Sequence, residues 1–145
     1  MASIETTIDI DATPDRIWAA LTDFAAYETW NPFIRRAKGE ARRGARLDAT
    51  MHLPGWKPMP LRPTILEAER NLALRWLGSL LFRGLFDGEH YFRIEHRDGG
   101  AASRLIHGER FSGILVPFVF GRSMRAATLQ AFGMMNQALK ARLEA

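Results

Sequence analysis

The sequence predicts an α+β fold in which a seven-stranded antiparallel sheet curls around a long C-terminal helix. Three observations support this prediction. The chain begins with an alternating segment and two short helical segments, continues as strands and turns from residue 34 to 112, and ends in one helical segment over 117–144. One face of an antiparallel sheet must be covered, and only the last helix is long enough to cover it. We therefore expect a single domain over residues 1–145.

The N-terminal region predicts a strand followed by two short helices. Residues 3–11 alternate between apolar and polar side chains, which is typical of a half-buried strand. Thr13 is a favourable N-cap and Pro14 a favourable first helical residue. The segment FAAYETW, 24–30, predicts a second short helix. This helix should end before Pro32, because a residue that precedes proline avoids the helical region.

The middle of the chain predicts the other six strands of the sheet. They are expected at 34–40, 45–53, 61–69, 71–78, 86–96 and 102–112. The segment 53–60 is rich in proline and glycine and predicts a loop. Asp98-Gly99-Gly100 predicts a tight hairpin between the last two strands. These strands form the meander that the helix must cover.

The C-terminal segment 117–144 predicts one helix with an apolar stripe. Met124, Thr128, Phe132 and Met135 recur at helical spacing and should face the sheet. Gly121 and Gly133 weaken this prediction, because glycine disfavours a helix interior.

Composition excludes several classes of function. The chain has no cysteine, which excludes disulfides, thiolate metal sites and a cysteine nucleophile. The net charge is +4 and the pI is about 10.1, but the arginines are dispersed and no nucleic-acid motif is present, so no nucleic-acid partner is expected. No basic segment with a following apolar run begins the chain, and no apolar run is long enough for stable membrane insertion. A cytoplasmic location is expected, and the chain is expected to be a monomer or a homodimer.

The strand RLIHGERFSG, 104–113, places polar groups on the face that should be buried. Leu105, His107, Glu109 and Phe111 share one face, and its two ends are large apolar groups. Burying a charged group without a partner costs several kcal/mol. The histidine and the carboxylate must therefore be satisfied either by internal partners or by water and a ligand in a cavity.

The preceding strand brings a second histidine to the same face. If the central residues of the hairpin turn are 98 and 99, His90 lies opposite His107, and if they are 99 and 100, it lies opposite Glu109. Either register keeps the same face parity, so Phe92 and Ile94 also share this face. A comparable face on the strand before it consists of Leu72, Leu74 and Trp76.

Three interpretations of this cluster stay open. His90, His107 and Glu109 can form a satisfied internal network, as buried polar groups usually do. They can supply the few polar groups of an otherwise apolar ligand cavity. They can also act as general acid and base. Two histidines and a carboxylate are possible metal ligands, but their spacing matches no metal motif, so neither a metal nor a cofactor is expected.

The order of elements and several local sequences resemble the SRPBCC superfamily, which includes START domains and birch-pollen-allergen-like proteins. The segments that carry the resemblance are IDIDATPDRIWAALTDFAAYETWNPF at 8–33, LRW at 74–76, LIHGERFSG at 105–113 and GRSMRAAT in the last helix. Among its members, the chain is most similar to small bacterial polyketide cyclase/dehydrase-like proteins. The resemblance implies a helix-grip fold, in which the sheet grips the long helix and the two short helices close one end. It also implies a mostly apolar cavity between sheet and helix.

The expected function is the binding of a small hydrophobic or aromatic molecule, lipid-like or polyketide-like, in that cavity. The expected ligand contacts are Trp76, His90, Phe92, Leu105, His107, Glu109, Phe111, Met124, Thr128, Phe132 and Met135. One alternative is an enzyme of cyclase/aromatase or dehydratase type, whose catalytic candidates are His90, His107 and Glu109. Another alternative is a lipid-transfer protein that uses the loops 53–60 and 78–84 as a gate.

Overall fold

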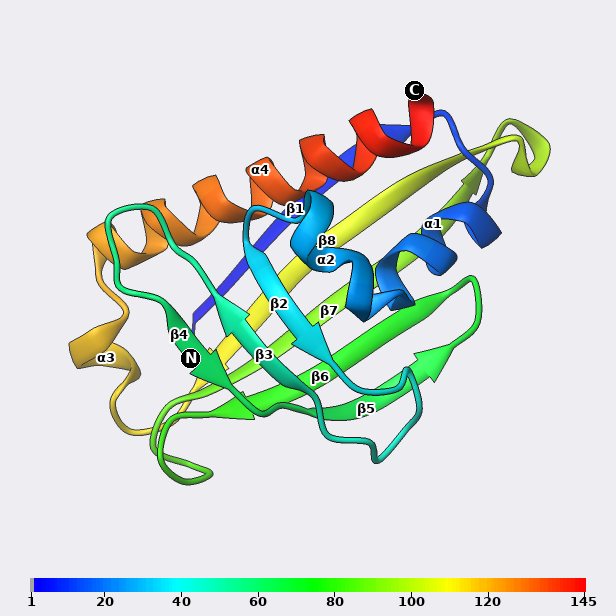
Figure 1. Ribbon diagram of the computed structural model, residues 1–145. Helices are drawn as coiled ribbons and strands as arrows, with labels where there is room; N and C mark the ends of the chain where they lie inside the picture. The colour runs from blue at the N-terminus through cyan, green and yellow to red at the C-terminus, as the bar shows by residue number, and fades with distance from the viewer. Residues whose placement is uncertain (1) are drawn as a thin grey trace.

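The computed structural model describes residues 2–145 and shows two antiparallel sheets around a long helix (Figure 1). The elements of the first half are β1 (Ala2–Ile10), α1 (Pro14–Thr22), the 3-10 turn η1 (Phe24–Ala26), α2 (Tyr27–Trp30), β2 (Ile34–Lys38), β3 (Asp48–Met51), β4 (Met59–Leu61) and β5 (Thr64–Glu69). Those of the second half are β6 (Ala73–Ser79), β7 (Asp87–Arg97), the 3-10 turn η2 (Asp98–Gly100), β8 (Ala102–Ser112), α3 (Val116–Val119) and α4 (Arg122–Glu144).

The α+β class and the grip of a curled sheet around the C-terminal helix are confirmed. One sheet has the order β1-β8-β7-β6-β5 and the other has the order β2-β3-β4, so the described strands number eight and not seven. The two sheets meet at the start of β5, where Arg46 and Thr64 form a bridge. Beside this bridge the Leu47 N–H donates to the Pro63 carbonyl at 2.8 Å. This junction lets the second sheet fold over the first (Figure 1).

The additional strand, β4, overlaps the segment that was expected to be a loop. Met59–Leu61 pairs with β3, and Pro60 lies opposite Thr50. Proline is tolerated there because β4 is an edge strand and needs no N–H on its open side. The strand expected at 61–69 begins only at Thr64, because Leu61 ends β4 and the residues 62–63 separate β4 from β5.

The C-terminal helical segment is divided in two, which corrects the single helix expected over 117–144. Gly121 has extended backbone angles, φ −93° and ψ −170°, and it ends the helical path after the short helix α3. The long helix α4 begins at Arg122. Its apolar stripe is as expected, since Met124, Thr128 and Phe132 are buried.

The β7–β8 hairpin has the second of the two registers allowed by the sequence. His90 lies opposite Glu109 and Phe92 lies opposite His107. The connection spans residues 98–101, which is longer than the two-residue turn expected.

For the neighbouring strand β6, the prediction that Leu72 shares the inward face was wrong. Leu72 is 43% exposed, because Asn71 has a φ of 65° and places Leu72 in the turn before β6.

The short helices position an aromatic side chain at the end of the core. The Asn31 Oδ1 atom, just after α2, accepts hydrogen bonds from the backbone N–H groups of Phe33 at 3.0 Å and Ile34 at 2.9 Å. This turn ends α2 and directs the Phe33 ring beneath the sheet, where its centroid lies 5.4 Å from that of Phe132.

Among residues 2–145, no helix is long and apolar enough to cross a membrane.

Candidate functional site

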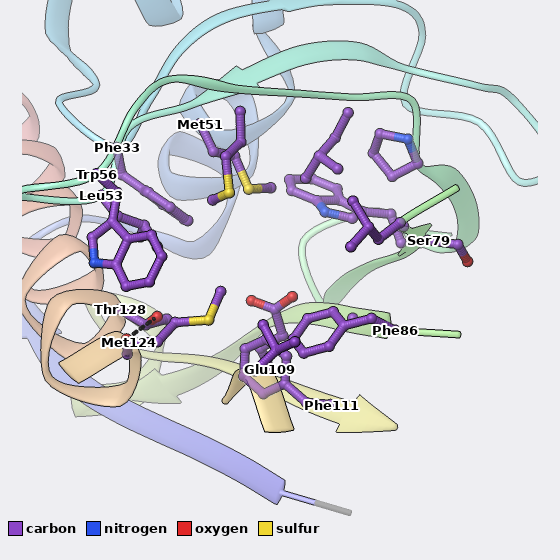
Figure 2. Close-up of a pocket in the computed structure, with 18 residues that line it drawn as sticks. Phe33, Met51, Leu53, Trp56, Ser79, Phe86, Glu109, Phe111, Met124 and Thr128 are labelled. Carbon is purple, nitrogen blue, oxygen red and sulfur yellow. Dashed lines mark hydrogen bonds between the residues drawn. The ribbon is translucent and has the colours of Figure 1, made fainter. Parts of the chain in front are cut away.

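A cavity of about 200 Å³ lies between the inner face of the large sheet, the first turns of α4 and the β3–β4 connection (Figure 2). Its wall is almost entirely apolar. The lining residues are Phe33, Met51, Leu53, Trp56, Met59, Leu61, Pro63, Trp76, Gly78, Ser79, Leu80, Phe86, Gly88, Glu109, Phe111, Val119, Met124 and Thr128. No lysine or arginine is among them. The site therefore favours an uncharged apolar molecule.

Two glycines explain why this part of the interior is open. Gly78 on β6 and Gly88 on β7 lie directly opposite each other, with the inward parity of Trp76 and His90. Neither contributes a side chain, so the sheet has room at this level for the Glu109 carboxyl group and for the cavity. A Cβ atom on Gly88 would lie 2.1 Å from Glu109 Oε2, so this glycine also makes room for the carboxyl group.

The residues expected to contact a ligand divide into two groups. Five of them line the cavity, namely Trp76, Glu109, Phe111, Met124 and Thr128. The other six lie in the packed interior beside it and do not line it, namely His90, Phe92, Leu105, His107, Phe132 and Met135. All eleven are buried, as the face parity implied. The parity indicates which face points inward, but it does not indicate where along that face the packing is incomplete.

The small sheet and its loop form a wall of the cavity that was not predicted from the sequence. Met51, Leu53, Met59 and Leu61 line the cavity from β3, β4 and the segment between them. Their alternation is a usable signal, but proline and glycine in the segment 53–60 favour a loop there and mask it. The loop residue Trp56 also reaches the cavity and is 44% exposed.

A chain of hydrogen bonds runs from the cavity wall into the interior. Glu109 Oε1 lies 3.2 Å from His90 Nδ1, and His90 Nε2 lies 2.8 Å from His107 Nε2. His107 Nδ1 lies 2.8 Å from Asn136 Oδ1. The Asn136 Nδ2 group then donates to the Thr6 hydroxyl at 2.9 Å, and that hydroxyl donates to the His107 carbonyl at 2.9 Å. Each of these side chains thus has at least one internal partner, and Glu109 also borders the cavity.

The far end of this chain fixes the direction of its donors. Because the Thr6 hydroxyl donates to a carbonyl, it accepts from the Asn136 amide, which then presents its oxygen to His107. His107 must therefore carry its proton on Nδ1 and accept at Nε2, so His90 donates from Nε2. In a neutral His90, Nδ1 is an acceptor, and its partner Glu109 carries the proton.

The electrostatic environment supports this neutral arrangement. Burial lowers the pKa of His90 to about 3 and raises the pKa of Glu109 to about 8. Burial also lowers the pKa of His107 well below its usual value, and the neighbouring His90 adds to this, while the hydrogen bond to Asn136 opposes it. The Glu109–His90 distance of 3.2 Å is longer than is usual for a charge-assisted bond, about 2.7–2.9 Å. Near neutral pH all three groups are therefore uncharged.

Aromatic rings enclose the two histidines. The His107 ring stacks on Phe132, with centroids 4.1 Å apart and planes 8° apart. The Trp76 indole stacks on His90 at 5.1 Å and 13°. No cluster of three or more potential metal ligands is found among the histidines and carboxylates of residues 2–145. This part of the interior is a packed core that contains polar groups.

Comparison with known protein families agrees with the geometry. The family described as "Polyketide cyclase / dehydrase and lipid transport" matches residues 1–144. A sequence search of curated proteins gives no significant match. The family match and the structural neighbours described next confirm the resemblance to the SRPBCC superfamily.

Several solved structures share the fold. A START superfamily protein from Mycobacterium smegmatis is 20% identical, with a TM-score of 0.74 over 98% of this chain and 97% of that chain. Ara h 8.0201 is 14% identical, with a TM-score of 0.72 over 98% and 97% of the two chains. The di-domain ARO/CYC StfQ from the steffimycin biosynthetic pathway is 15% identical, with a TM-score of 0.73 over 98% of this chain. The match covers 50% of StfQ, so this chain spans half its length. Identities this low establish the fold alone.

Proposed function

The chain belongs to the polyketide cyclase/dehydrase and lipid-transport family of the SRPBCC superfamily, and we propose that it binds a small hydrophobic or aromatic molecule in the cavity beneath β6–β8. The single observation that carries this proposal is the open, almost wholly apolar space beside the facing glycines Gly78 and Gly88. Burial of apolar surface supplies the affinity, at about 25 cal/mol per Å².

The cavity wall supports a binding role in a second way. Met51, Met59 and Met124 come from three different elements and surround the space. Methionine side chains are flexible and polarisable, so such a wall adapts to ligands of different shape. This composition favours recognition of a ligand by its shape and by apolar contacts. Only the few polar groups at one end of the cavity can select for polar groups of the ligand.

The proposal is tested by native mass spectrometry of freshly purified protein, followed by solvent extraction, and by titration with the uncharged fluorescent probe N-phenyl-1-naphthylamine. We expect saturable binding of one probe molecule per chain, and displacement of the probe by any apolar compound that is extracted. Probe fluorescence that rises without saturation would indicate nonspecific surface contact and would contradict the proposal.

Catalysis of cyclase/aromatase or dehydratase type has less support from the geometry. His90 and His107 are fully buried, do not line the cavity, and have both ring nitrogens in hydrogen bonds. A general base must reach the proton that it removes. Of the three catalytic candidates, only Glu109 borders the cavity, and it would act as an acid rather than as a base while it stays protonated.

Lipid transfer is a second candidate, and an exposed apolar rim favours it. Leu81 and Phe82 on the β6–β7 loop, and Ile114 and Phe118 on the β8–α4 connection, are all more than half exposed. The two segments adjoin, because the Ile114 N–H donates to the Gly84 carbonyl at 3.1 Å. Neighbouring Leu80 and Val119 line the cavity, so the rim lies at its mouth. Apolar surface of this kind is typical of a contact with a membrane or another protein.

Transfer is tested with a fluorescent phospholipid exchanged between vesicles that contain anionic lipid, because exposed Arg83 and Arg122 flank the apolar rim. The double variant Leu81→Asp/Phe118→Asp should slow exchange by about tenfold or more, since each carboxylate opposes insertion. Met134→Asp, on the exposed side of α4, is the matched control and should leave the rate unchanged. Equal rates in both variants would remove this second candidate.

A further inference from the structure

Two polar groups in the cavity wall have no hydrogen-bond partner within residues 2–145. The Trp76 indole is 2% exposed, and its Nε1 donor is unpaired. Glu109 uses Oε1 toward His90, and its Oε2 atom makes no hydrogen bond to a described residue. The other buried polar group of the wall, the Thr128 hydroxyl, is satisfied by the Met124 carbonyl at 2.6 Å. A buried donor without a partner destabilises the native state, so Trp76 Nε1 is a candidate contact for a ligand.

The two unpaired groups lie at the same end of the cavity. Trp76 is paired with His90 in the β6–β7 register, and His90 is paired with Glu109 in the β7–β8 register. The three residues therefore stand side by side across three strands with the same inward parity. Figure 2 shows the Glu109 carboxyl group pointing from β8 into the cavity. Trp76 and Glu109 both line the cavity at this end.

The hydrogen-bond chain determines what Glu109 offers to a ligand. The direction of the chain places the carboxyl proton on Oε1, where it is donated to His90. Oε2 is then a carbonyl-like acceptor without charge. A cationic ligand would find no carboxylate to neutralise it, and an anionic ligand would find no lysine or arginine in the wall.

From this geometry we infer that the end of the cavity beside β7 is a subsite for one hydroxyl group of an uncharged and otherwise apolar ligand. The Trp76 Nε1–H donates to the hydroxyl oxygen, and the hydroxyl proton is donated to Glu109 Oε2. A single alcohol or phenol group satisfies both unpaired groups at once. The inference rests on the proposed function as a ligand-binding protein, and it names the chemical class of the ligand.

Three probes of similar size test the subsite by isothermal titration calorimetry with the full chain. They are 1-naphthol, 1-methylnaphthalene and 1-naphthylmethylammonium. We expect 1-naphthol to bind at least about tenfold more tightly than 1-methylnaphthalene, because it pairs two groups that are otherwise unsatisfied. The ammonium probe should bind most weakly, because a cation loses its hydration without gaining a countercharge.

Variants separate the roles of the two side chains. Trp76→Phe removes the donor and keeps an aromatic ring, so the preference for 1-naphthol should fall to about threefold or less. Glu109→Leu should also remove the preference. Glu109→Gln should restore it, because an amide donates to His90 and accepts from the ligand as the protonated carboxyl does. Met134→Ala, on the surface of α4, is the control and should change none of the three affinities.

The outcomes distinguish the subsite from the proposed function. Equal affinities for 1-naphthol and 1-methylnaphthalene would overturn the subsite and leave apolar binding intact. Tightest binding of the ammonium probe, lost in Glu109→Gln, would also overturn it, because Glu109 would then be ionised. If none of these probes and no N-phenyl-1-naphthylamine binds, both the subsite and the proposed function fail.

Discussion

The space between the sheet and α4 has two halves that differ in packing although they share the same strands. Toward the β7–β8 turn, Phe92, His107 and Phe132 fill the interior; His107 stacks on Phe132 and packs at a tilt against Phe92. Toward the opposite end, the same faces of β6 and β7 continue as Gly78 and Gly88, and the cavity opens. We call these the packed half and the cavity half. The boundary runs through Trp76, His90 and Glu109.

The two halves differ in what they contribute to the stability of the fold. The packed half buries rings and closes its hydrogen bonds internally, so it contributes to the free energy of folding. The cavity half gives up part of that packing, because a void leaves its lining atoms without partners. Glu109 belongs to both halves, since it ends the internal chain and borders the open space.

The largest expected effect compares one substitution in the two halves. Phe132→Ala should lower the free energy of unfolding by about 4 kcal/mol, because it creates a new cavity among stacked rings. Phe111→Ala should cost about half as much, because Phe111 already borders an open space. Urea unfolding at equilibrium measures both values. Equal losses would show that the two halves do not differ in packing.

A second change fills the cavity half. Gly78→Leu should weaken binding of N-phenyl-1-naphthylamine by about 10- to 100-fold, because the new side chain occupies the space near Pro63. The backbone of Gly78 is compatible with an L-residue, so the change in folding free energy should stay near 1 kcal/mol. Fluorescence titration and urea unfolding separate the two effects. Unchanged affinity in a folded variant would place the bound probe elsewhere.

The boundary residue Glu109 should give the protein a specific dependence on pH. In the unfolded chain Glu109 is ionised above its ordinary pKa of 4.5, whereas in the native state it stays protonated up to about pH 8. Between pH 6.5 and 8 the native state binds the extra proton, so stability falls as pH rises. Relative to Glu109→Gln, the wild type should lose on the order of 2 kcal/mol over this window.

Below pH 6.5 the two histidines dominate and the sign reverses. His90 and His107 have lowered native pKa values, so the unfolded state binds more protons and stability falls as the pH falls from 6.5 toward 3. Urea unfolding of wild type and Glu109→Gln at several pH values measures both limbs. A difference between the two proteins that does not vary from pH 6.5 to 8 would mean that Glu109 is ionised in the native state.

The smallest expected effect lies outside both halves. A Cβ atom on Gly133 of α4 would meet nothing within 4 Å. Gly133→Ala should therefore raise the free energy of unfolding by about 0.5–1 kcal/mol through helix propensity, without any change in probe affinity. Thermal unfolding with a parallel titration measures both. A loss of affinity would mean that the helix backbone moves when ligand binds.

The sequence was sufficient for the fold class because its strongest signals are local. Alternation in β1, the paired strands β7 and β8 and the stripe of α4 each follow from residue spacing. The end of the helical path at Gly121 and the division of the strand near Pro63 were harder to predict. Each depends on one residue, and a periodicity summed over many residues is insensitive to a single position.

The cavity itself could be predicted only in part. Face parity placed Trp76, Glu109 and Phe111 inward, and all three line the cavity. Parity says which face of a strand a residue lies on, but not where along the strand the interior is open. It therefore could not distinguish Glu109, which lines the cavity, from His107, the next residue on the same face of β8. The facing pair Gly78 and Gly88 was the missing signal, and it becomes visible only when the β6–β7 register is known.

We propose that an apolar ligand occupies the cavity half and not the packed half, and methionine-methyl NMR distinguishes the two locations. The chain has six methionines, of which Met51, Met59 and Met124 line the cavity, Met135 lies in the packed half and Met134 lies on the surface. On titration with N-phenyl-1-naphthylamine, we expect saturable shifts of the three cavity methyl signals and small changes at Met134 and Met135. Shifts confined to Met134, or spread equally over all methyl groups, would contradict the claim.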